Sequence, residues 1–139
     1  MSVSEKLPAL IILPTYPWIS EADHRWRCDL ECFLATHKKL VVVTLNPGVN
    51  IDDVTKLLQK LEYVDQTRLA VFGQHFGGLL ALHALMSNKP EFPNLKCGLV
   101  VAPIINSTFI SSFTKDMLLA MNKSLTIPHE VGGLADKQV

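Results

Sequence analysis

The sequence predicts an α/β fold with a mostly parallel sheet of about four strands and flanking helices. Short, continuous apolar runs alternate along the chain with longer amphipathic segments. Parallel strands that are buried on both faces have this unbroken apolar composition. The runs are rich in Val, Ile and Leu and cover residues 9–13, 40–45, 69–72 and 98–102. Strands and helices in alternation indicate right-handed βαβ units.

The segments between the first three runs carry helix signals. Ser20 is suited to cap a first helix, with Asp23 three residues later. One face of that helix would present Trp26, Leu30, Phe33 and Leu34. Asn50 is suited to cap a second helix, with acidic residues in the first turn, near the positive end of the helix dipole. These acidic residues are Asp52 and Asp53, and the apolar stripe is Val54, Leu57, Leu58 and Leu61.

Two further helices are predicted in the second half of the chain. Residues 77–87 are apolar nearly all round and end before Asn88 and Pro90, so we expect a central, buried helix. A fourth helix is expected over residues 108–121. We assign residues 6–121 to one domain and expect the aperiodic residues 122–139 to be a loose tail.

Composition excludes several function classes. The 139 residues are 48% hydrophobic and carry thirteen basic and thirteen acidic side chains, which describes one soluble globular domain. A net charge of zero, with scattered Lys and Arg, argues against nucleic acid or an anionic membrane face as a partner. The N-terminal residues lack a signal-peptide pattern, and no apolar stretch approaches the roughly 20 residues that span a bilayer. We expect no direct membrane insertion and no cofactor.

The three cysteines cannot all pair within the chain. Cys28 and Cys32 lie four residues apart in a predicted helix, where a disulfide across one turn fits poorly. We expect both to be reduced and buried.

The most informative segment is a predicted strand, a glycine-containing turn and an apolar helix. The turn consists of Gly73, Gln74, His75, Phe76, Gly77 and Gly78. In α/β-hydrolases the nucleophile lies in such a turn, with the pattern Gly-x-Ser-x-Gly. Gly73 and Gly77 match the two glycines, and His75 stands in the middle. Histidine tolerates positive φ, but imidazole does not supply the hydroxyl or thiol that acyl transfer requires.

Two interpretations of His75 compete. The first is a retained turn from which a serine has been lost. The second makes His75 a base or a metal ligand, which would need further ligands at suitable spacing. The other histidines are scattered through the sequence at His24, His37, His83 and His129. We predict no metal site.

Several blocks, in order, resemble the catalytic domain of the prolyl oligopeptidase family, dipeptidyl peptidase IV branch. The resemblance runs from Lys6 to about Met121, the extent of a partial α/β-hydrolase domain. The blocks are KLPALIIL with Pro17, the trio Ala22, Asp23 and Arg27, the set Tyr63, Val64, Asp65 and Arg68, the turn FGQHFGG, and residues 96–104. Their shared order and spacing make the resemblance specific.

The resemblance implies that the catalytic machinery is incomplete. His75 falls on the family nucleophile, and Pro14 falls on the tyrosine of the oxyanion hole, with Tyr16 two residues away as an alternative. The family's catalytic Asp and His lie downstream of the last matching block, so no position here inherits them. The family also has a longer, glycine-rich connection where this chain has residues 45–49. Cys97 matches a cysteine whose disulfide partner is absent here.

Three hypotheses follow. The resemblance favours a non-catalytic, dipeptidyl-peptidase-like protein that acts by binding other proteins, with a membrane channel or a second copy as the implied partner and the extracellular side of the plasma membrane as the implied location. The second hypothesis is an active serine hydrolase with another nucleophile. The third is a truncated isoform without independent activity, because ending after a fourth strand leaves an unpaired sheet edge.

Overall fold

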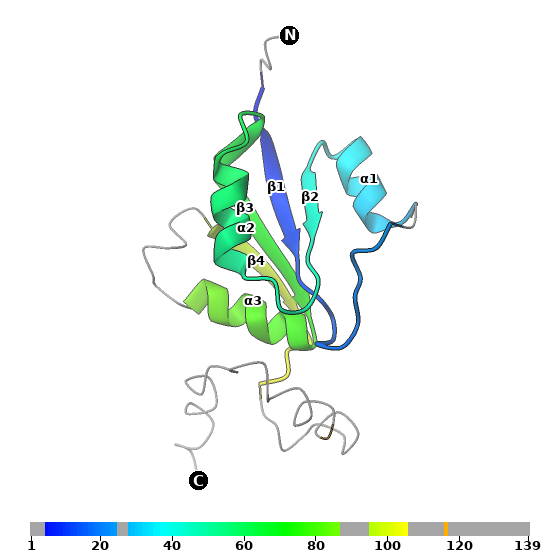
Figure 1. Ribbon diagram of the computed structural model, residues 1–139. Coiled ribbons are helices and arrows are strands. Elements are labelled where there is room, and N and C mark those ends of the chain that lie inside the picture. The colour runs from blue at the N-terminus through cyan, green and yellow to red at the C-terminus, as the bar shows by residue number, and fades with distance from the viewer. Residues whose placement is uncertain (1–4, 25–27, 87–94, 106–115, 117–139) are drawn as a thin grey trace.

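The computed structural model describes residues 5–24, 28–86, 95–105 and Asp116. Within them, four parallel strands form one sheet in the order β2-β1-β3-β4 (Figure 1). The strands are β1 (Leu7–Ile12), β2 (Val41–Thr44), β3 (Val64–Gln74) and β4 (Leu95–Val101). The helices are α1 (Leu30–His37), α2 (Ile51–Gln59) and α3 (Phe76–Met86). The predicted α/β class and parallel sheet are confirmed.

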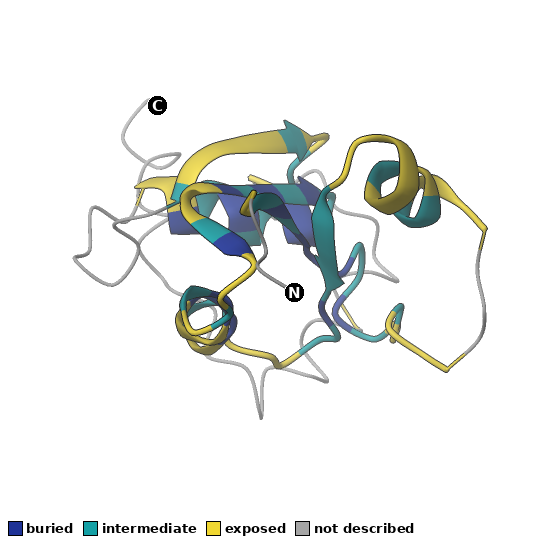
Figure 2. Cartoon of the chain, turned by 90° about the horizontal axis from the view of Figure 1, so that it is seen from above, coloured by how far each residue is buried: buried dark blue, intermediate teal, exposed yellow. Residues whose placement is uncertain are grey.

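The core lies around the two central strands. Helix α1 stands beside β2, whereas α2 and α3 pack on the opposite face of the sheet (Figures 1 and 2). The largest side chains with almost no exposure are Ile11, Leu13, Leu58, Leu69, Val64, Val71 and Thr55. Each fully buried aliphatic side chain contributes roughly 1.5–3 kcal/mol. The sheet centre is therefore the most stable part of the fold, and it supports the turns at the strand ends.

Strand β4 differs from its prediction. The expected strand at 98–102 was interpreted as buried, but β4 begins at Leu95 and most of its residues are exposed. The side chain of Leu99 is 62% exposed and that of Val101 is 39% exposed. The reason is position: among the described residues β4 pairs with β3 alone, so it is an edge strand.

Helix α2 follows its prediction closely. The Asn50 side chain accepts a hydrogen bond from the Asp52 backbone N–H at 3.0 Å, which is the predicted cap. Val54 and Leu58 are buried. Leu57 was placed in the apolar stripe but is 58% exposed, so that assignment was wrong. Thr55 is buried instead, and its hydroxyl donates a hydrogen bond to the Ile51 carbonyl at 2.9 Å.

Helix α1 was predicted incorrectly. It begins at Leu30, after Asp29, rather than after Ser20, and it has no buried residue. Leu30 and Phe33, expected on an apolar face, are 57% and 47% exposed. The residues after Ser20 do not continue into a helix because Asn46 binds both backbone groups of Ala22. Trp26 lies outside the described residues.

Helix α3 agrees with its prediction to within one residue at its start. The helix begins at Phe76 instead of Gly77, and Leu85 and Met86 at its end are exposed rather than buried. The predicted helix at 108–121, apart from Asp116, and the tail at 122–139 lie outside the described residues. In the part of the chain that is described, no helix is long and apolar enough to span a bilayer.

The expectation that Cys28 and Cys32 are buried was wrong. Cys28 is exposed and Cys32 is partly exposed, although all three cysteines are thiols. Cys28 lies before the helix rather than within it. This position also removes the geometric objection to a Cys28–Cys32 disulfide.

Candidate functional site

The turn between β3 and α3 has an unusual backbone conformation at His75. Its φ is 51°, in the left-handed region that non-glycine residues seldom occupy. The surrounding backbone holds it there: the His75 N–H donates to the Val101 carbonyl at 3.0 Å. The His75 carbonyl accepts from the N–H groups of Leu79 and Ile104, each at 3.2 Å. The turn is therefore fixed by both α3 and the end of β4.

Two glycines allow this turn to pack. A Cβ at Gly73 would collide with the backbone of Gly77. A Cβ at Gly77 would lie 2.6 Å from the carbonyl oxygen of Pro14, which is too close for any side chain. The glycines at both positions are thus required by close backbone approach, as the turn pattern predicted.

The loop after β1 closes over the same turn. The backbone N–H of Phe76 donates to the Thr15 carbonyl at 3.2 Å. In a hydrolase turn, the amide of the residue after the nucleophile is one of the donors that stabilise the oxyanion. Here that amide is bonded to the protein's own main chain.

Three rings stack beside the turn. The Tyr16 ring stacks with Trp18, with ring centroids 5.3 Å apart, and with His75, with ring centroids 5.5 Å apart. The interplanar angles are 22° and 25°, so both pairs are stacked. Pro14 is buried beneath the loop, with its carbonyl facing Gly77. The structure therefore brings Tyr16, rather than Pro14, against the His75 ring.

The loop that carries Tyr16 is held by two residues that sequence reasoning missed. Glu21 accepts a hydrogen bond from the Thr15 backbone N–H at 3.1 Å. Asn46 accepts from the Ala22 N–H at 2.8 Å and donates to the Ala22 carbonyl at 2.9 Å. Asn46 belongs to the short connection after β2. Its position before Pro47 and Gly48 was the available signal, because such residues mark a tight turn.

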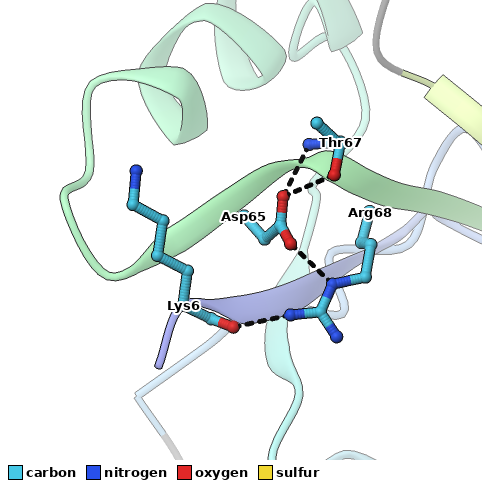
Figure 3. Close-up of polar contacts among 4 residues, drawn as sticks. All are labelled: Lys6, Asp65, Thr67 and Arg68. Carbon is cyan, nitrogen blue, oxygen red and sulfur yellow. Dashed lines mark hydrogen bonds and ion pairs between the residues drawn. The ribbon is translucent and has the colours of Figure 1, made fainter. Parts of the chain in front are cut away.

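The opposite end of β3 carries a polar network (Figure 3). Asp65 accepts hydrogen bonds from the backbone N–H and hydroxyl of Thr67 at 2.9 and 2.7 Å. It also pairs with the Arg68 Nε at 2.6 Å, and Arg68 donates through Nη2 to the Lys6 carbonyl at 2.7 Å. The Thr67 bonds first, and then Arg68, lower the pKa of Asp65 to about 2. This network joins the start of β3 to the start of β1.

The other histidines do not converge on His75. His24 lies in the exposed part of the loop after β1, and His37 ends α1, where its ring stacks on Phe33. His83 is half-buried on α3, where it lines a cavity of about 220 Å³ with Phe76, Leu80 and the start of α2. His129 lies outside the described residues. Across the described ranges, no three His, Cys, Asp or Glu side chains form a group that could hold a metal.

Two solved structures share the fold of this chain. It matches dipeptidyl peptidase 4 of Porphyromonas gingivalis with a TM-score of 0.69 at 21% identity, over 94% of this chain and 21% of that one. It also matches the α/β-hydrolase GrgF of a Penicillium species with a TM-score of 0.54 at 20% identity, over 86% of this chain and 45% of that one. The parallel sheet and the β3–α3 turn are those of an α/β-hydrolase fold.

Within that class, the chain belongs to the prolyl oligopeptidase family, whose model matches residues 44–128. It is 32% identical over 91 residues to inactive dipeptidyl peptidase 10 of Rattus norvegicus, covering 60% of this chain and 11% of the relative. It is 26% identical over 131 residues to probable dipeptidyl-aminopeptidase B of Aspergillus oryzae, covering 78% of this chain and 14% of the relative. The chain thus spans only a small part of the length of these relatives.

Proposed function

We propose that this chain is a non-catalytic member of the family, with His75 at the nucleophile position of a retained turn, and that it acts by binding protein. The observation that carries the first part is the Phe76–Thr15 hydrogen bond beside His75. A site prepared for acyl transfer holds its amide donors open toward the substrate. In this protein the Phe76 amide instead donates to the Thr15 carbonyl of the same chain.

Two separate contributions to acyl transfer are missing from this arrangement. The imidazole at position 75 does not provide the alcohol that forms the acyl-enzyme. The Phe76 amide is engaged, and loss of a single oxyanion donor lowers the rate roughly 100- to 1,000-fold. Pro14 offers neither a hydroxyl nor a backbone N–H, and the Tyr16 ring stacks with the His75 ring. The two losses concern different groups of the site, so restoring the hydroxyl leaves the amide engaged.

A turnover assay tests this proposal. The purified chain is incubated with a dipeptide anilide that has proline in the second position, alongside a His75→Ala variant. We expect no release of the anilide above the rate without protein, and no difference between the two proteins. Release that is abolished in His75→Ala would show that the imidazole takes part in catalysis and would overturn the proposal.

The proposed binding surface is β4. Leu99 and Val101 are exposed on β4, which pairs with β3 alone among the described strands, so the backbone groups on its other side can pair with another chain. An edge strand is self-complementary across a two-fold axis, so a second copy is the simplest protein partner. A relative that carries "inactive" in its name supports a role other than catalysis.

Analytical ultracentrifugation tests self-association. We expect a concentration-dependent dimer that Leu99→Asp shifts to monomer. Leu57→Asp serves as the control, because Leu57 has similar exposure but lies on α2. A chain that stays monomeric at all concentrations, or a dimer that both variants leave unchanged, would contradict β4 as the interface.

A further inference from the structure

Cys28 and Cys32 form a thiol pair at the start of α1. The two side chains are hydrogen-bonded to each other, Cys28 is exposed and Cys32 is partly exposed. Asp29 occupies the N-cap position with an extended backbone, so Cys28 precedes the helix and only Cys32 lies within it. The pair therefore joins one residue inside the helix to one residue just before it.

This placement decides whether a disulfide is geometrically possible. Two residues four apart inside a helix have Cβ atoms about 5–6 Å apart, whereas a disulfide needs about 3.5–4.5 Å. Cys28 is not held in helical geometry, so it can approach Cys32 without unwinding α1. The two side chains are already within hydrogen-bonding reach of each other.

We propose that Cys28 and Cys32 are a redox-active dithiol, which a peroxide-class oxidant closes to an intramolecular disulfide. The Cys28 thiolate attacks one peroxide oxygen, which gives a sulfenic acid and releases hydroxide. The Cys32 sulfur then attacks the sulfenic sulfur and displaces a second hydroxide, and the protons from the two thiols complete two molecules of water. The two sulfurs are each oxidised by one electron, and hydrogen peroxide accepts both electrons.

The two thiols have different surroundings, which assigns their roles. Partial burial, followed by the charge and hydrogen bond of Cys28 and then the charge of Asp29, raises the pKa of Cys32. Cys28 is the more exposed of the two thiols, which makes it the attacking group, and Cys32 is the thiol that closes the disulfide. Cys97 is also exposed but lies on β4, so it offers a matched single thiol within the same chain.

The expected consequence is local stabilisation of α1. This helix has eight residues and none is buried, so little tertiary packing holds it. A covalent link between Cys28 and Cys32 would fasten the incoming chain to the first helical turn. Oxidation should then slow hydrogen exchange in α1 and leave exchange in β1 and β3 unchanged.

Peptide mass analysis tests the proposal on the full chain. The reduced protein is treated with stoichiometric hydrogen peroxide, alkylated under denaturing conditions and digested with trypsin. Residues 28–38 form one tryptic peptide because Arg27 and Lys38 bound it. We expect this peptide to lack both alkyl groups and to be lighter than the reduced peptide by two hydrogens. The Cys97 peptide should stay alkylated.

Single substitutions separate the two roles. In Cys32→Ser, oxidation should stop at a sulfenic or sulfinic acid on Cys28. In Cys28→Ser, Cys32 should remain alkylatable, and Cys97→Ser should oxidise like the unaltered protein. Doubly alkylated peptide 28–38 in oxidised protein, disulfides that involve Cys97, or unchanged exchange in α1 after closure would overturn the proposal.

Discussion

The two ends of β3 teach different lessons about what a family fold retains. At its start, Asp65, Thr67 and Arg68 form a complete polar network that ties β3 to β1. At its end, His75 occupies a strained turn whose neighbouring amide is bonded to the chain itself. The first set of residues ties the two strands together where their pairing shifts register, between Leu7 and Ala9 of β1. The second maintains the shape of a turn, and we propose that its chemistry has been lost.

The comparison separates structural from chemical requirements along one strand. Gly73 and Gly77 are needed because backbones approach too closely for a Cβ, whatever residue stands at position 75. Replacing a nucleophile leaves that packing requirement in place. A chain can therefore keep the turn for stability alone, and the following predictions test the two ends separately.

The largest effect is expected at the turn. Gly77→Ala should lower the free energy of unfolding by about 3 kcal/mol or more, because the new Cβ would meet the Pro14 carbonyl in a backbone contact that does not yield easily. Gly48→Ala is the control: it has a φ of 85° but open space, so it should cost about 1–2 kcal/mol from backbone strain. Denaturant titration measures both, and equal losses would show that close packing at the turn is unimportant.

A smaller effect is expected from the ring stack. Tyr16→Ala should cost about 1–2 kcal/mol because it removes the ring that stacks with both Trp18 and His75. It should also shift the His75 imidazole proton resonances, since the ring current of Tyr16 disappears. Tyr63→Ala, at an exposed tyrosine, should stay within about 0.5 kcal/mol and leave those resonances in place. Unchanged His75 resonances in Tyr16→Ala would mean that the rings do not stack in solution.

The smallest effect on stability is expected from protonation of Asp65 at acidic pH. The pKa of Asp65 is lowered from 3.8 to about 2 in the fold, so its ionised form stabilises the native state. That contribution is complete above the unfolded-state pKa and is lost as pH falls through the folded-state value. The stability difference between the unaltered protein and Asp65→Asn should therefore shrink as pH falls from about 4 to about 2. A difference that is constant over this window would contradict the network at the start of β3.

Local patterns predicted the fold better than they predicted the site. Continuous apolar runs located all four strands, Asn50 marked the start of α2, and glycine spacing located the turn at His75. These features depend on neighbouring residues. The exposure of Leu57 and the late start of α1 depend on packing between distant segments, which periodicity does not contain.

The same limit applies at the candidate site. The Thr15–Phe76 hydrogen bond and the Tyr16–His75 stack each join residues about 60 positions apart, brought together because β1 and β3 are neighbours. Strand order was not predictable from composition. The sequence alone shows that residue 75 is a histidine. The hydrogen bond from the Phe76 amide to Thr15 is visible only in the structure.

Fluorophosphonate labelling of His75→Ser tests the central claim most directly. This substitution restores the hydroxyl but leaves the Phe76 amide bonded to Thr15. Intact mass measurement should show no adduct on the unaltered chain and none on His75→Ser. An adduct at the introduced serine would mean that the turn still activates a nucleophile and stabilises an oxyanion. That result would contradict a turn retained for its shape alone.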